Sequence, residues 1–183
     1  RILGPHHPDT LASRHNLASA YRDAGRLNDA IYLHQQNLES LTCILGPHHP
    51  QTLASHNNLA SAYQATGKLD DAIYLHQQNL DDRTRILGPR HPDTLTSRNN
   101  LASAYQAIGR LNDAIPLFEQ TFEDFENLFG PNHPLTLASR NNLANTYRAA
   151  GRYEDAQKLF ETPSDSEDEQ DDTEEEPDQE TGD

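Results

Sequence analysis

The side chains of this chain that could do chemistry are mostly histidines and amides. Ten histidines occur in 183 residues, including the adjacent pairs His6-His7 and His48-His49. A helical metal site usually places two ligands at positions i and i+4 on one face, with hydrogen-bonding groups behind them. No two histidines have this spacing, and adjacent histidines in a loop point in different directions. We therefore interpret them as structural, with adventitious cation binding as the alternative, and predict no metal and no cofactor.

Nothing in the sequence resembles the common motifs of enzymes. There is no Gly-x-x-x-x-Gly-Lys-Ser/Thr phosphate loop, no Gly-x-Ser-x-Gly elbow and no His-Glu-x-x-His zinc motif. The single cysteine, Cys43, cannot form an internal disulfide or a thiolate metal cage. We predict no catalytic residue and no enzymatic activity, and a metal-dependent enzyme is kept only as a third alternative.

Charge is concentrated at one end of the chain. The formal net charge is −15, from 29 acidic and 14 basic side chains. Residues 161–183 hold 13 of the acids and no base, so residues 1–160 carry a net charge of −2. Nucleic-acid binding needs a basic face, so it is not expected. We predict that 162–183 is a disordered acidic tail that solubilises the protein, docks a basic partner or is phosphorylated at Ser164, Ser166 or Thr173.

Length and hydropathy argue against a membrane protein. No apolar run approaches the roughly 20 residues that a membrane span requires, and no signal-peptide pattern opens the chain. With a single cysteine, a secreted disulfide scaffold is also excluded. A cytoplasmic protein that is monomeric as this fragment is expected.

The elements that must position these side chains repeat every 42 residues. Comparison of 4–45 with 46–87 gives 30 identical positions out of 42. Gly-Pro marks the start of each unit, at Gly4-Pro5, Gly46-Pro47, Gly88-Pro89 and Gly130-Pro131. Within each unit the apolar pattern predicts one helix from the His-Pro step to a glycine such as Gly25, and a second helix from there to the next Gly-Pro. The chain therefore reads as an all-α solenoid of tandem helix-turn-helix repeats.

The first helix of each unit has a packing side and a polar side. Leu11, Leu17, Ala18, Tyr21 and Ala24 fall within one arc of about 140° at 100° per residue. Small alanines at equivalent positions allow close approach of neighbouring helices, and the tyrosines are their large partners. We expect this arc to pack against adjacent helices.

The repeats resemble the tetratricopeptide repeat family, specifically its kinesin-light-chain type. The resemblance rests on Leu17-Ala18-x-x-Tyr21, Gly25 and Ala30, on the Leu-Gly-Pro-x-His-Pro loop and on the Asn-Asn-Leu-Ala stretches. It covers residues 1–161 and implies a right-handed superhelix. The domains are the end of a preceding repeat (1–3), the repeat array (4–161, with repeats 4–45, 46–87, 88–129 and 130–161) and the tail (162–183). We expect this chain to be the C-terminal piece of a longer protein.

The sequence departs from the family pattern at two positions. Three residues before the leucine of that pattern, where an apolar residue is usual, stand Arg14, His56, Arg98 and Arg140. Where an aromatic residue is usual on the second helix, repeats 1 and 2 have His34 and His76, and the later repeats have Phe118 and Phe160. The first two repeats are therefore expected to pack less tightly than the third.

The polar side of the first helices is the candidate binding site. In tetratricopeptide solenoids these helices line a concave groove, so the resemblance implies that an amide ladder lies along it, able to donate to and accept from an extended peptide backbone. The candidate residues are Asn16, Asn58, Asn100 and Asn142, then Ser19, Ser61, Ser103 and Asn145, flanked by Asn57, Asn99 and Asn141 and by Arg22 and Arg148. The alternative is a solvated helix face stabilised by amide pairs between repeats.

We therefore expect a non-enzymatic protein–protein interaction scaffold that binds a peptide or partner protein. The main alternatives are a sensor array at the C-terminal end of a signalling NTPase (NB-ARC/STAND-like) and a kinesin-light-chain-like cargo adaptor. A phosphate-loop motif in upstream sequence would favour the sensor, and a coiled coil would favour the adaptor.

Overall fold

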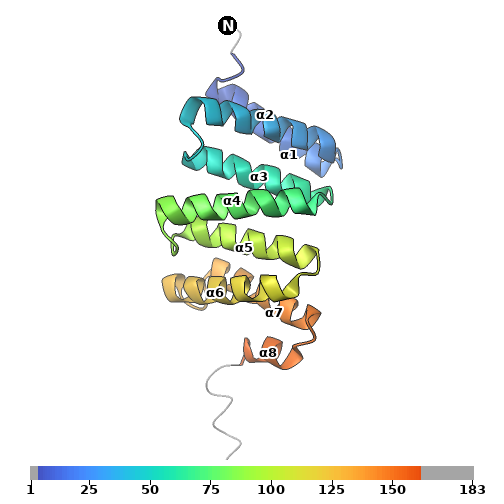
Figure 1. Ribbon diagram of the computed structural model, residues 1–183, viewed down its shortest axis with the longest axis vertical. Helices are drawn as coiled ribbons and strands as arrows, with labels where there is room; N and C mark the ends of the chain where they lie inside the picture. The colour runs from blue at the N-terminus through green and yellow to red at the C-terminus, as the bar shows by residue number, and fades with distance from the viewer. Residues whose placement is uncertain (1–3, 162–183) are drawn as a thin grey trace, which may run out of the picture.

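The structure, a computed structural model, describes residues 4–161, which form a stack of eight helices (Figure 1). Each repeat contributes two helices, and each helix packs on the next one along the chain. The predictions for 1–3 and 162–183 lie outside the described residues. The helices are α1 (Pro8–Asp23), α2 (Leu27–Leu45), α3 (Pro50–Ala65), α4 (Leu69–Leu87), α5 (Pro92–Ala107), α6 (Leu111–Phe129), α7 (Pro134–Ala149) and α8 (Tyr153–Lys158). The predicted all-α solenoid is confirmed.

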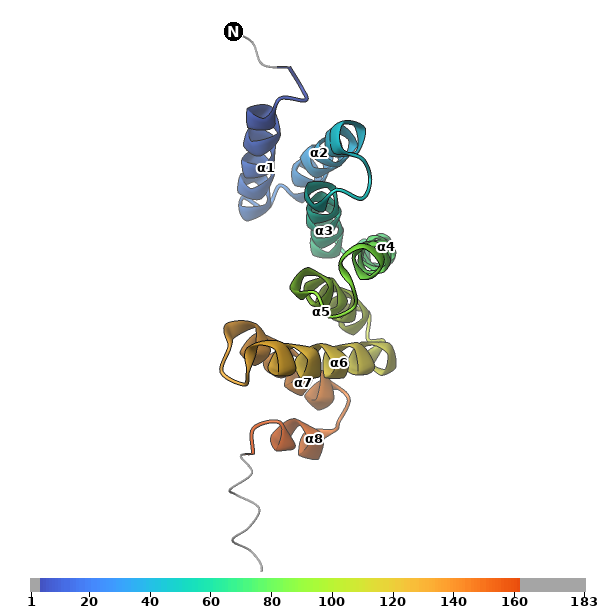
Figure 2. The ribbon, with the colours of Figure 1, turned by 90° about the vertical axis from the view of Figure 1, so that its left-hand side faces the viewer.

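First helices (α1, α3, α5, α7) alternate with second helices (α2, α4, α6, α8) along an elongated array. The two ends of the described chain lie at opposite ends of the stack. In the side view, α2 lies to the right of α1 and α4 to the right of α3 (Figure 2). Because a solenoid repeat contacts only its neighbours, side chains from consecutive repeats meet at three successive junctions, which we call 1/2, 2/3 and 3/4.

Every first helix begins at the His-Pro step, and the histidine itself is the cap. Proline occupies the first turn, where its missing N–H costs nothing. The Nδ1 atom of the preceding histidine accepts a hydrogen bond from the backbone N–H two residues later, at 3.2 Å in all four repeats. This cap was not anticipated from the sequence, because imidazole is not among the usual N-cap side chains. The capping residues are His7, His49, His91 and His133.

The turn between the two helices of a repeat has the same construction four times. Gly25 has φ +74° and Gly67, Gly109 and Gly151 have φ +75°, in the left-handed region that glycine enters without strain. The basic residue after each glycine then lies over the tyrosine of the first helix, as Arg26 does over Tyr21 with 4.2 Å from its guanidinium carbon to the ring centroid. The predicted helix stop at glycine is confirmed.

Alanine permits the close contact of helices, as predicted. Ala18, Ala60, Ala102 and Ala144 of the first helices are completely buried, and so are the equivalent alanines of α2, α4 and α6. The packing arc is wrong at two residues, because Ala24 is exposed and Leu17 is 45% exposed, whereas Leu59 is only 5% exposed. Ile31 of α2 packs on Leu59, but no helix within residues 4–161 lies on the corresponding side of α1.

Two of the basic residues that depart from the family pattern, Arg14 and Arg98, connect the two helices of their repeat by hydrogen bonds. Arg98 is 6% exposed, and its Nη1 atom donates to Asp124 on α6 at 2.7 Å. In repeat 1, Arg14 donates to the side chain of Asn37 and to the carbonyl of Gln36, both at 3.3 Å. The usual apolar contact at this position is therefore replaced by a polar connection between α1 and α2 and between α5 and α6.

No helix in residues 4–161 has both the length and the hydropathy needed to cross a membrane.

Candidate functional site

The predicted polar side chains occupy the first helices, but their exposure differs. Asn58, Asn100 and Asn142 are half-buried, as are Asn57 and Asn99. The other predicted positions are half-buried (Ser19, Ser103) or exposed (Asn16, Ser61, Asn141, Asn145, Arg22, Arg148). Each basic side chain has a neighbour, since Arg22 contacts Asp23 at 3.2 Å and Arg148 donates to Asn145 at 3.1 Å. The structure thus places all of the predicted residues on the first helices, where some of them are half-buried and the others are exposed.

Two pairs of these amides join consecutive repeats. Asn100 Nδ2 donates to Asn57 Oδ1 at 2.8 Å across junction 2/3, and Asn142 Nδ2 donates to Asn99 Oδ1 at 3.1 Å across junction 3/4. We call each pair an amide clasp. For these four residues the structure shows the pairing that the sequence analysis gave as the alternative to peptide binding. Each clasp leaves unused hydrogen-bonding capacity, because an amide has two donor hydrogens and an acceptor oxygen.

Junction 1/2 has no clasp among the described residues. The position of Asn57 and Asn99 is occupied in repeat 1 by His15, whose ring lies 6.0 Å from the ring of His34. Asn58, the counterpart of Asn100 and Asn142, makes no side-chain hydrogen bond within residues 4–161. Burial lowers the pKa of His34, and the nearby His15 and Arg22 lower it further. The ring of His34 is therefore suited to the neutral state.

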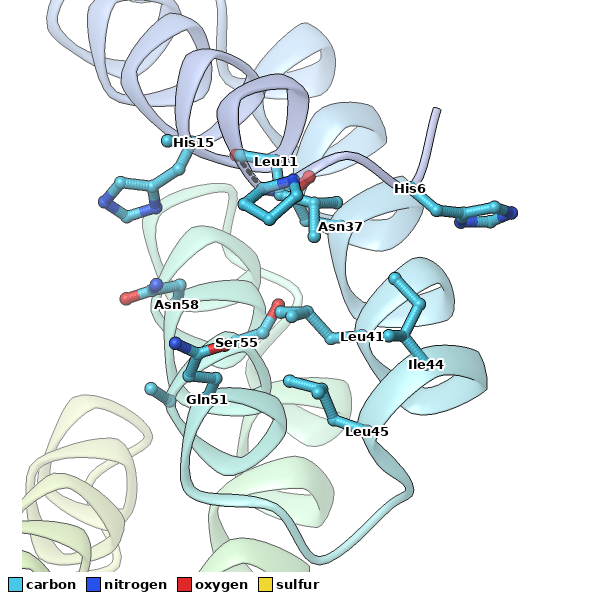
Figure 3. A pocket seen from close by; sticks show the side chains of 13 residues that line it. His6, Leu11, His15, Asn37, Leu41, Ile44, Leu45, Gln51, Ser55 and Asn58 are labelled. Carbon is cyan, nitrogen blue, oxygen red and sulfur yellow. Dashed lines mark hydrogen bonds between the residues drawn. The ribbon is translucent and has the colours of Figure 1, made fainter. Parts of the chain in front are cut away.

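A groove of about 450 Å³ opens at junction 1/2, between α1, α2 and α3 (Figure 3). Its walls include the aliphatic side chains of Leu11, Leu41, Ile44 and Leu45. Leu41 and Leu45 point from α2 towards α3, and His15 and Asn58 lie together on the other side of the groove. Histidine is the only titratable residue type among the lining residues. The groove thus combines apolar walls with a polar edge.

The equivalent place is occupied at the other two junctions. Junction 3/4 retains only about 70 Å³, and there the counterpart of Leu41 is Phe125, which is 3% exposed. At junction 2/3 the counterpart is Arg83, which is 9% exposed and donates from Nη1 to the carbonyl of Asp93 at 2.8 Å. Junction 1/2 is therefore open because it lacks both the clasp and the larger side chain.

Sequence analysis missed this groove, although the aligned repeats contain its signal. Leu41, Arg83 and Phe125 occupy one repeat position, and His15, Asn57 and Asn99 occupy another. Repeat 1 differs from repeats 2 and 3 at both of these positions. The change of Leu41 was not considered, and that of His15 was not connected with an opening, because a helical wheel does not show which side chains of neighbouring repeats meet.

The described residues contain no group of three or more His, Cys, Asp or Glu side chains placed to hold a metal ion. Cys43 is exposed near the end of α2.

The family of the chain follows from comparison with known proteins. The model of the tetratricopeptide repeat matches residues 13–81, 51–126 and 99–162. No curated protein sequence matches the chain. Among solved structures, it is similar to the nearly identical TPR-like repeats of a Podospora anserina protein assigned as a kinesin light chain, with 38% identity, a TM-score of 0.72, and coverage of 86% of this chain and 75% of that one.

Two further structures are similar. A form of the Podospora anserina repeats with a single substitution gives 37% identity and a TM-score of 0.74, with 86% of this chain and 74% of that chain covered. BtubC (BKLC) from P. vanneervenii has the same fold at 17% identity, with a TM-score of 0.72 and coverage of 100% of this chain and 74% of that one. The chain therefore belongs to the tetratricopeptide repeat family, and its repeats are of the kinesin-light-chain-like type.

Proposed function

We propose that this protein is a non-enzymatic interaction scaffold that binds an extended peptide, or an extended segment of a partner protein, along its first helices. The observation that carries the proposal is the open groove at junction 1/2, with Asn58 at its edge, whose amide has no partner among the described residues. Apolar pockets with a few well-placed polar groups are typical of binding sites. The fold, which belongs to a family of protein–protein interaction scaffolds, supports the same conclusion.

The polar residues divide into two groups under this proposal. Asn58 makes no side-chain hydrogen bond within residues 4–161, and Asn16, Asn141 and Asn145 are exposed on the first helices. Asn100 and Asn142 already hold the repeats together, so they contribute to binding only through their remaining donor and acceptor capacity. Loss of Asn58 should therefore weaken binding more selectively than loss of either clasp residue.

The test uses peptides selected from a displayed random library on the full chain. For peptides so selected, Asn58→Ala should cost about 0.5–1.5 kcal/mol of binding free energy, the usual range for one hydrogen bond. Gln120→Ala is the matched control, because it removes an exposed amide from the second helix α6. Helicity of both variants should equal that of the parent chain.

Two outcomes would contradict the proposal. One is selection of no peptide that binds above background. The other is selection of peptides whose affinity is unchanged by Asn58→Ala, and by the triple change of Asn58, Asn100 and Asn142 to Ala in a chain that remains folded.

The similarity to kinesin-light-chain-type repeats favours one narrower role, that of an adaptor connecting a partner to a larger assembly. It would use the same surface. A coiled-coil region elsewhere in the same gene product, and association of that region with a second protein, would support this role.

A further inference from the structure

A basic residue of repeat 4 lacks the partner that its counterpart has in repeat 3. Arg98 of repeat 3 donates to Asp124 at 2.7 Å and to the carbonyl of Pro89 at 3.1 Å. The side chains of this ion pair are only 7% and 11% exposed. Arg140 occupies the same position in repeat 4, and its Nε atom is buried without a hydrogen-bond partner within residues 4–161. Because a buried N–H without an acceptor is costly, Arg140 is placed to bind an acceptor that these residues do not supply.

The second helix of repeat 4 ends before the positions that bind this residue in other repeats. In repeats 1 and 3 the partners on the second helix are Gln36, Asn37, Ser40 and Asp124. The corresponding positions of repeat 4 are 162, 163 and 166, whereas α8 ends at Lys158. Position 166, the counterpart of Asp124, is a serine between Asp165 and Glu167. The sequence after α8 therefore has a carboxylate on each side of this position.

The distribution of charge favours the acidic tail as the source of the acceptor. Residues 130–160 contain four basic and two acidic side chains, whereas acids outnumber bases in each of the other three repeats. Within residues 4–161 the ion pairs of repeat 4 all involve Arg152, so none involves Arg140 or Arg148. Residues 161–183 hold 13 acids and no base. The repeat with a net positive charge is thus the one to which the polyanionic segment is attached.

Arg140 also lies next to the point at which the tail begins. The guanidinium carbon of Arg140 is 4.9 Å from the centroid of the Phe160 ring. Asp165 follows Phe160 by five residues, and an extended chain advances roughly 3.3 Å per residue. The first carboxylates of the tail are therefore within reach of the guanidinium. Arginine binds carboxylates strongly because its planar group can donate two parallel hydrogen bonds.

We propose that the start of the acidic tail binds Arg140 of its own chain through a carboxylate of Asp165, Glu167 or Asp168, and so covers the α8 end of the stack. The contact takes the place of the Arg98–Asp124 ion pair of repeat 3. Within residues 4–161 no further repeat packs beyond α8, and the outer face of a terminal solenoid repeat needs a polar cover. This inference concerns the opposite end of the array from the groove at junction 1/2 and does not depend on peptide binding.

The first experiment neutralises two sets of acids in the full chain with little change in side-chain size. The near set is Asp165→Asn, Glu167→Gln and Asp168→Asn, and the matched far set is Glu174→Gln, Glu175→Gln and Glu176→Gln. At about 20 mM salt, the near set should reduce the hydrogen-exchange protection of α7 and α8 about fivefold, as for a partly exposed ion pair. It should also shift the ¹H–¹⁵N signal of Arg140 Nε. The far set should do neither, and equal effects of the two sets would overturn the proposal.

Two variants of α7 then identify the residue that binds the tail. Arg140→Gln should abolish the difference in protection between the near set and the unchanged tail, because no guanidinium remains to be paired. Arg148→Gln is the matched control, since it removes the same charge from an exposed position of α7 and should preserve the difference. The opposite pattern would show that the assigned contact is wrong. If Arg140→Gln unfolded repeat 4, the effect of the near set on the Arg140 Nε signal would still decide the matter.

Salt and protein concentration distinguish an intramolecular ion pair from other causes. The fivefold loss should disappear at about 1 M salt, where charges are screened beyond roughly 3 Å. It should also stay constant over about a tenfold range of protein concentration, because the tail and α7 belong to one chain. A loss that persists at high salt would mean that the tail does not act through charge. A loss seen only at high protein concentration would assign the contact to a second copy, and either result would contradict the proposal.

Discussion

Repeats 2 and 3 each fold into two helices of the same lengths, yet different side chains fill the space between the two helices in each repeat. His76 is 1% exposed in repeat 2, and Phe118 is 0% exposed at the equivalent place in repeat 3. Neither ring nitrogen of His76 has a hydrogen-bond partner within residues 4–161, and neither do the amide atoms of Asn79. In repeat 3 the counterpart of Asn79 is Thr121, which donates to the carbonyl of Leu117 at 2.6 Å.

The hydrophobic core is also larger around repeat 3 than in the N-terminal half of the array. The largest cluster of buried apolar side chains surrounds Phe118 and includes Ile115, Leu143 and Tyr147. The cluster at the N-terminal half contains only Ile31, Leu59 and Ala62 as buried members. Glycine turns, prolines and alanines thus specify the helices in every repeat, and the side chains between them decide how stable each repeat is. Because stability in a solenoid is nearly a sum over repeats and their junctions, such local differences should be measurable one repeat at a time.

Among the tests of this comparison, lowering the pH should have the largest effect on the stability of repeat 2. Burial lowers the pKa of His76 to about 4 from its ordinary 6.5. As the pH falls below 6.5, the unfolded chain binds a proton that the folded repeat excludes, so the free energy of unfolding decreases until about pH 4 and then becomes level. The loss from His76 alone should be about 3 kcal/mol. Burial also lowers the pKa values of His34 and His56, which adds to the effect.

The measurement is hydrogen exchange of the full chain at several pH values, with correction for intrinsic rates. Protection in α2, α3 and α4 should be lost before protection in α6 and α7. His76→Phe is the control, because it should remove about the same 3 kcal/mol of acid sensitivity. Equal acid sensitivity in the variant would show that His76 does not titrate as its burial implies.

Phe118→His should convert repeat 3 into a repeat of the weaker kind. The change removes a fully buried ring and introduces two ring nitrogens into an apolar cluster, so we expect a loss of about 2–3 kcal/mol in the free energy of unfolding. Urea denaturation followed by circular dichroism measures it. Phe160→His is the matched control and should have little effect, since Phe160 is 44% exposed. Similar losses from both changes would contradict the comparison.

His76→Phe should have a moderate effect in the opposite direction at neutral pH. It replaces a buried ring that lacks partners with the residue that repeat 3 uses at the same place, so a gain of about 0.5–2 kcal/mol is expected. The gain should appear as a higher urea midpoint and as slower exchange confined to repeat 2 and its neighbours. Destabilisation would instead mean that the imidazole is hydrogen-bonded in solution.

The smallest predicted effect concerns the clasps. Asn100→Ala removes the donor to Asn57 and should cost about 1 kcal/mol of stability at junction 2/3, as for one ordinary hydrogen bond. Asn58→Ala removes no hydrogen bond within residues 4–161 and should leave the unfolding midpoint nearly unchanged. Exchange rates in α3 and α5 provide the measurement. If the two variants were equally stable, the clasp would have no role in holding the repeats together.

Much of the fold could be predicted from single residues. The His-Pro step and the glycines gave the limits of the first helices, because proline suits a first turn and only glycine enters the left-handed region without strain. The exposure of Leu17 could not be predicted, since it depends on which helix covers α1. The pairing of Asn100 with Asn57, rather than with Asn58, also could not be read from the sequence, because it depends on how far one repeat is rotated relative to the next.

The histidine caps have a consequence for the protons that the rings carry. A nitrogen that accepts a hydrogen bond from a backbone N–H has its lone pair directed at that hydrogen, so the single proton of the neutral imidazole must be on the other nitrogen. His7, His49, His91 and His133 therefore share the tautomer protonated at Nε2. At the start of every first helix the chain thus presents an N–H donor of fixed direction, and the ring ¹⁵N chemical shifts of these four residues report individually whether each helix has formed its first turn.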